Sequence, residues 1–230
     1  MAADLTPDPI QTPRRFFDST RLTQPGYGTV LLFIGIAYIS CAWQKTTDPA
    51  EFALLVQLAT IWAIFHATNA RPRIRQLGTI VLLFCALATG IVWIFGYTGT
   101  ITTTVMTAAS LILYGVAPAA IVRHQAARTK VDGQTLLAII CAYILIGMFF
   151  TFAFGLAGLH SDLFGLGTQT TLSTALFFSF TSLTTTGYGN LIPATELGQT
   201  LAIMEVLTGQ LFVALGIARV VTSWLPRRAS

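Results

Sequence analysis

The residues of this chain with the clearest chemical potential are five consecutive ones near its end, Thr185, Thr186, Gly187, Tyr188 and Gly189. Glycine adopts backbone angles that other residues avoid, so the alternating glycines allow successive carbonyl oxygens to point in one direction. Residues 175–184, which precede this stretch, are apolar or carry hydroxyl groups, and residues 197–224, which follow it, form a long apolar run with few charges. The pattern predicts a strand of aligned carbonyls held between two apolar elements.

This order of parts resembles the pore of bacterial potassium channels, and the resemblance covers about residues 136–224. It implies a selectivity filter in which four chains each supply one strand, so that a ring of carbonyls replaces the hydration shell of a potassium ion. The coordinating groups would be the carbonyls of Thr185, Thr186, Gly187 and Tyr188 and the Thr185 hydroxyl, with Gly189 completing the filter. We therefore expect a homotetrameric, potassium-selective channel and not an enzyme, with potassium ions in the filter and no organic cofactor.

The resemblance also gives roles to residues around the filter. Thr184 would end the pore helix, whose partially negative end then points at the cavity. Phe177 and Phe178 would pack around the filter, although they also suit an ordinary apolar helix surface. Glu205 is an ionisable residue at membrane depth, and such residues are functional candidates. We expect it behind the filter, hydrogen-bonded to hydroxyl groups of the pore helix.

Two glycines in the last apolar run, Gly209 and Gly216, compete for the role of hinge in the pore-lining helix. Gly209 lies where the family usually has such a glycine, and a residue without a side chain lets a helix bend. Tight packing between helices explains either glycine equally well.

Three positions depart from the family's pattern. Thr186 replaces the usual valine of the filter, which leaves a weakly selective cation channel open as an alternative. Thr181 and Asn190 stand where some relatives have a glutamate and an aspartate whose carboxyl groups pair behind the filter. Because that pair cannot form here, we expect Thr181, Thr186 and Glu205, or an ordered water among them, to form a substitute hydrogen-bond network.

The composition is that of a membrane protein. Hydrophobic residues make up 54% of the chain and charged residues 10%, whereas soluble domains carry roughly a quarter charged residues. Six apolar segments could serve as helices that cross the hydrocarbon core, and they occupy residues 29–43, 52–67, 77–97, 101–122, 136–156 and 197–224. The expected fold is an all-α membrane protein with six transmembrane helices, and with a re-entrant pore helix and filter between the fifth and sixth.

Basic residues test this count. They cluster before the first segment, between the second and third, between the fourth and fifth, and after the sixth. With six spans all four clusters lie on one side, which the positive-inside rule places in the cytoplasm. We expect a multi-pass protein of the plasma or inner membrane, in contact with lipids, with both termini cytoplasmic and with no nucleic-acid partner.

These segments divide the chain into five parts. We expect a cytosolic N-terminal tail (1–27), a four-helix transmembrane domain (28–122), a cytosolic linker (123–133), a pore domain (134–225) and a short cytosolic C-terminus (226–230). Voltage-gated potassium channels share this plan, but their fourth span carries arginines that the membrane field moves. Because residues 101–122 contain no lysine or arginine, we expect a sensor-like domain without a sensor.

Two other sequence features, residues 160–162 and a second Gly-Tyr-Gly, have alternative interpretations. An intramembrane hydrolase would use His160, Ser161 and Asp162, but neighbouring side chains in a loop converge poorly into a triad, and no nucleophile motif surrounds Ser161. A second Gly-Tyr-Gly, at residues 26–28, follows Pro25 and predicts a turn that leads into the first apolar segment.

Overall fold

The computed structural model describes residues 27–43, 59–60, 62–64, 99–126 and 132–224. Their helices are α1 (Tyr27–Trp43), α4 (Thr100–Ala126), α5 (Gly133–Gly158), α6 (Leu172–Leu183) and α7 (Glu196–Trp224). Parts of α4, α5 and α7 are long and apolar enough to cross a membrane, namely Thr103–Ala126, Gly133–Gly158 and Glu196–Thr222. The described part of the chain therefore has the build of a helical membrane protein.

Four of the six predicted apolar segments lie in α1, α4, α5 and α7. The segment at 77–97 and most of the segment at 52–67 fall outside the described residues, so the count of six spans stays a prediction. Helix α1 begins at Tyr27, the tyrosine of the second Gly-Tyr-Gly. Helix α4 continues to Ala126, into the predicted linker, and its last turn contains Arg123 and His124, where positive charge suits the helix dipole.

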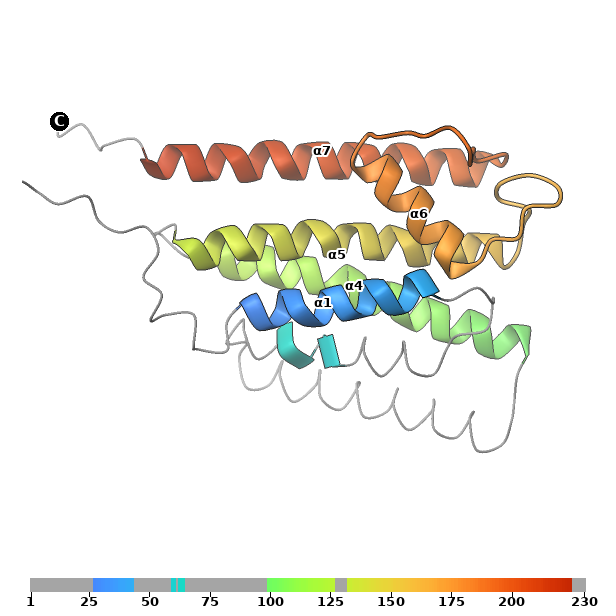
Figure 1. The fold of residues 1–230 in the computed structure, drawn as a ribbon, viewed down its shortest axis with the longest axis horizontal. Helices are drawn as coiled ribbons and strands as arrows, with labels where there is room; N and C mark the ends of the chain where they lie inside the picture. The colour runs from blue at the N-terminus through green and yellow to red at the C-terminus, as the bar shows by residue number, and fades with distance from the viewer. Residues whose placement is uncertain (1–26, 44–58, 61, 65–98, 127–131, 225–230) are drawn as a thin grey trace, which may run out of the picture.

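Helix α5 is the centre of the bundle (Figure 1). It packs against α1, α4, α6 and α7. Figure 1 shows α4, α5 and α7 running lengthwise, while the short α6 crosses obliquely between α5 and α7. This arrangement makes α5 the scaffold that positions α6 and the strand after it.

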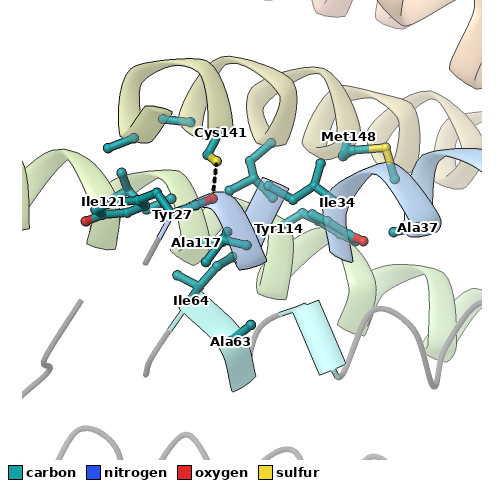
Figure 2. Packing of buried hydrophobic residues seen from close by; sticks show 14 of the residues in the cluster. Tyr27, Ile34, Ala37, Ala63, Ile64, Tyr114, Ala117, Ile121, Cys141 and Met148 are labelled. Atoms are coloured by element: carbon teal, nitrogen blue, oxygen red, sulfur yellow. Dashed lines mark hydrogen bonds between the residues drawn. The ribbon is translucent and has the colours of Figure 1, made fainter. Parts of the chain in front are cut away.

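Side chains of α1, α4 and α5 share one apolar core (Figure 2). Tyr114 of α4 is fully buried and stacks on Phe152 of α5, with ring centroids 5.2 Å apart and planes 12° apart. The thiol of Cys141 on α5 donates a hydrogen bond to the carbonyl of Tyr27 on α1 at 3.5 Å, drawn as a dashed line in Figure 2. Because helices in lipid associate mainly through close packing and interhelical hydrogen bonds, these contacts fix α1 and α4 on the outer face of α5.

The start of α5 is set by a capping box. The Asp132 carboxylate accepts a hydrogen bond from the backbone N–H of Thr135 at 2.9 Å, and the Thr135 hydroxyl oxygen accepts one from the backbone N–H of Asp132 at 3.4 Å. Such reciprocal bonds satisfy donors that the first helical turn leaves without partners. The local sequence thus fixes where α5 begins.

Candidate functional site

Helix α6 ends next to the candidate site, the predicted filter at residues 185–189. Its start is capped by Thr171, whose hydroxyl oxygen accepts a hydrogen bond from the backbone N–H of Thr174 at 3.2 Å. Its C-cap is Thr184, the residue at which the sequence predicts the helix to end. The partially negative end of α6 therefore lies directly beside Thr185, the first residue of the predicted filter.

The backbone of residues 185–189 alternates in handedness. The φ angle is 57° at Thr185, 53° at Gly187 and 76° at Gly189, while Thr186 and Tyr188 do not have positive φ. Glycine tolerates positive φ, but a β-branched residue such as Thr185 is strained there. Strain of this kind persists where the surrounding structure imposes it, and it clusters at functional sites.

Hydrogen bonds fix the direction of the carbonyls in this strand. The backbone N–H groups of Thr186 and Gly187 both donate to the carbonyl of Thr181 in α6, at 2.8 Å and 3.1 Å. In a planar trans peptide the carbonyl points opposite to the N–H, so the carbonyls of Thr185 and Thr186 both point away from α6. Successive carbonyls on one side are what the sequence predicts for an ion-coordinating strand, and an ordinary β-strand does not provide them.

The two neighbouring phenylalanines of α6 do different things. Phe177 stacks on Tyr188 of the strand, with ring centroids 5.7 Å apart and planes 13° apart. Phe178 meets Phe154 of α5 and Phe164 of the loop edge to face, with ring centroids 4.9 Å and 5.1 Å apart. Phe177 therefore contacts the predicted filter through Tyr188, while Phe178 fixes α6 on α5 and the loop.

The Thr181 and Thr186 hydroxyl groups do not bond directly to Glu205 in the structure. The Thr181 hydroxyl donates within its own helix, to the carbonyls of Phe177 and Phe178 at 2.9 Å and 3.0 Å, because residues one turn earlier lie closest to it. Thr181 instead supports the strand through its backbone carbonyl.

The other members of the predicted network have different partners too. The Thr186 hydroxyl lies 2.8 Å from that of Thr184, which itself donates to the Phe180 carbonyl at 2.7 Å. Since Thr184 has thereby used its only proton, Thr186 is the donor between them. Asn190 is exposed at the end of the strand. The hydroxyl behind the filter position is therefore satisfied locally and does not reach Glu205.

Glu205 is fully buried between α7, α6 and α5. Its Oε1 lies 2.5 Å from the Ser179 hydroxyl oxygen, which lies 2.8 Å from the carbonyl of Gly147. The sequence predicts a pore-helix hydroxyl as the partner of Glu205 but does not single out Ser179. The helical spacing of Ser179 with Ala175 and Leu183, all on the buried face of α6, is the signal that could have identified it.

The two candidate hinge glycines both lie at close helix contacts. A Cβ at Gly209 would come within 2.5 Å of the Leu183 Cδ1 atom and 3.4 Å of the Leu183 carbonyl oxygen. A Cβ at Gly216 would come within 3.1 Å of Ile139 Cγ2 on α5. The structure thus gives Gly209 a clear packing role against the end of α6, and the hinge role stays a prediction.

A single chain leaves the site open on one side. Tyr188 is 69% exposed, and residues 184–190 are exposed throughout. In the most apolar window of α7 11% of the residues are buried, against 61% in that of α5. The carbonyl side of the strand and most of α7 therefore lack protein neighbours within one copy of the described chain.

Two other kinds of site, a metal site and a serine nucleophile, find little support among the described residues. No group of three or more His, Cys, Asp or Glu side chains within them is arranged to hold a metal ion. In the loop after α5, the Ser161 hydroxyl donates to the carbonyl of Ala157 at 2.9 Å. This bond occupies the proton that a catalytic base would have to remove from Ser161.

Comparison with known proteins agrees with this geometry. A family model described as an ion channel matches residues 138–224, a region that begins in α5, contains α6 and the strand, and ends with α7. Searches of curated proteins and of solved structures each found no match. The family match supports an ion channel, and it covers the part of the chain that contains the aligned carbonyls.

Proposed function

We propose that this chain forms a homotetrameric, potassium-selective channel, with Thr185, Thr186, Gly187, Tyr188 and Gly189 as its filter. The observation that carries the proposal is the alternating backbone of this strand and the pair of N–H groups that bond to α6. Carbonyls that face away from α6, as those of Thr185 and Thr186 do, can replace the hydration shell of a potassium ion when several strands surround it. The ion-channel family match over the same region supports this reading.

A tetramer would complete the ring of filter strands, of which one chain supplies a single strand. One chain provides one strand, and a potassium filter of this kind uses four. Four copies around one axis would bring the strands together and would cover part of the exposed surface of α7. Non-helical backbone at membrane depth requires surrounding protein or a water-filled path, and such an assembly supplies both.

The channel would lie in the cell membrane among lipids, with both termini in the cytoplasm. Phe177, stacked on Tyr188, would hold the outer half of the filter strand. Ion-replacement recording from the purified protein tests the proposal, because potassium should carry current where sodium does not.

Opening of this channel should depend little on membrane voltage. A charge that crosses the whole membrane field contributes about 2.3 kcal/mol per 100 mV. The basic residues of α4 are Arg123 and His124, both in its last turn, so the body of the helix has no positive charge to move. Conductance measured against voltage in a planar bilayer should therefore lack steep activation, and Arg123→Gln should leave its slope unchanged. A slope equivalent to several gating charges would contradict this prediction.

A further inference from the structure

Among the described residues, Glu205 is the acidic side chain that is fully buried. Its surroundings form a chain of contacts across three helices, from Glu205 on α7 through the Ser179 hydroxyl on α6 to the Gly147 carbonyl on α5, at 2.5 Å and 2.8 Å. Its second oxygen, Oε2, has no hydrogen-bond partner within the described residues. The direction of these hydrogen bonds determines whether Glu205 is protonated or ionised.

The Ser179 hydroxyl has one proton to donate but lies beside two oxygens. The Gly147 carbonyl can only accept a hydrogen bond. If Ser179 donates to Gly147, the Glu205 carboxyl must donate to Ser179, and this requires a proton on Glu205. If Ser179 instead donates to an ionised Glu205, one bond is all that supports a buried negative charge.

Charge favours the first arrangement. Helices α5 and α6, which enclose Glu205, contain no lysine, arginine or histidine, and Arg219 on α7 lies about 21 Å farther along the helix. The Tyr143 hydroxyl of α5 donates to the Leu183 carbonyl at 3.1 Å. A buried carboxylate without a partner charge is so costly that the group takes up a proton instead.

We infer that Glu205 is protonated and donates a hydrogen bond to the Ser179 hydroxyl oxygen, as an uncharged link between α7 and α6. Ser179 in turn donates to Gly147, so the link continues to the central helix of the bundle. Glu205 is therefore a positioning residue, which holds the helix that ends at the filter. The expected effect of Glu205 on conduction rests on the proposed channel function. The inference that Glu205 is protonated does not depend on that function.

Infrared spectroscopy of the purified protein tests the proton directly. At neutral pH exposed carboxyl groups are ionised, so a band of protonated carboxyl in the parent should come from Glu205. The band should disappear in Glu205→Gln, persist in Glu196→Gln, which removes an exposed carboxyl of the same helix, and shift in Ser179→Ala. A parent without the band, a band that survives Glu205→Gln, or one that does not respond to Ser179→Ala would each overturn the inference.

Potassium current tests the consequence of the link. Glutamine is uncharged and can donate a hydrogen bond, so Glu205→Gln should conduct within about twofold of the parent. Glu205→Leu should conduct at least roughly two- to tenfold less, because every chain loses one hydrogen bond. Equal currents from Glu205→Leu and the parent would overturn the positioning role. A parent that carries no potassium current would contradict the proposed function instead, and the infrared result would still decide whether Glu205 is protonated.

Discussion

Gly187→Ala should abolish potassium conduction while the protein still assembles in the membrane. Gly187 has a φ of 53°, and an alanine in this left-handed region costs roughly 1–2 kcal/mol. An added Cβ would meet no other atom within 4 Å in one chain, so the backbone and not crowding within the chain makes the substitution costly. In a filter of four strands the cost adds to about 4–8 kcal/mol, which lowers the population of intact filters roughly a thousandfold or more.

Gly167→Ala is the matched control. Gly167 lies in the loop between α5 and α6, has a φ of 88°, and likewise has no atom within 4 Å of an added Cβ. The two substitutions therefore impose similar backbone strain, but only Gly187 belongs to the predicted filter. Currents from the two reconstituted variants, compared with their elution in gel filtration, separate the effects. Normal current in Gly187→Ala, or equal loss in both variants, would be incompatible with a filter at residues 185–189.

Gly209→Ala should weaken the contact between α7 and the end of α6. The new methyl group would lie 2.5 Å from Leu183 Cδ1, and Leu183 is fully buried. Because protein interiors are closely packed, a fully buried side chain such as Leu183 has little room to move. Overpacking of this kind costs typically about 1–3 kcal/mol per site, so the unfolding temperature of the assembled protein should fall and potassium current should fall with it.

A double mutant distinguishes packing from bending. If Gly209 is needed for close contact, Leu183→Ala should recover part of the loss in Gly209→Ala, so that the double mutant is more stable than the sum of the single effects predicts. Gly216→Ala should cost less, because its methyl group would come no closer than 3.1 Å to the Ile139 side chain. Full stability of Gly209→Ala with a current that no change at Leu183 restores would favour a hinge over a packing role.

The sequence predicts the site well where chemistry is local. The glycines at 187 and 189 and the helix end at Thr184 follow from turn and helix rules, and the structure has positive φ and a helix cap at those positions. Glu205 is buried and lies beside a hydroxyl group of α6, an arrangement that follows from the cost of burying a polar group without a hydrogen-bond partner.

The sequence does not determine the contacts between helices, because these depend on which face of each helix meets its neighbour. Phe177 and Phe178 are adjacent and chemically identical, yet one stacks on Tyr188 and the other packs toward α5. The choice of Ser179 over Thr181 as the partner of Glu205 depends on which face of α6 meets α7, and the Thr181 hydroxyl bonds to carbonyls of its own helix. The strain at Thr185 likewise appears only once the strand is tied to α6, since no local rule places a β-branched residue at positive φ.

The reversal potential of purified, reconstituted protein, with potassium on one side of the bilayer and sodium at equal concentration on the other, tests the central claim most directly. A filter of aligned carbonyls from residues 185–189 predicts a reversal potential far from zero, in the direction set by potassium. It also predicts that Thr186→Val preserves this preference, because the Thr186 hydroxyl bonds locally to Thr184 and coordination comes from the backbone. A reversal potential near zero, with sodium and potassium carrying similar currents, would contradict the account and would identify a weakly selective cation channel.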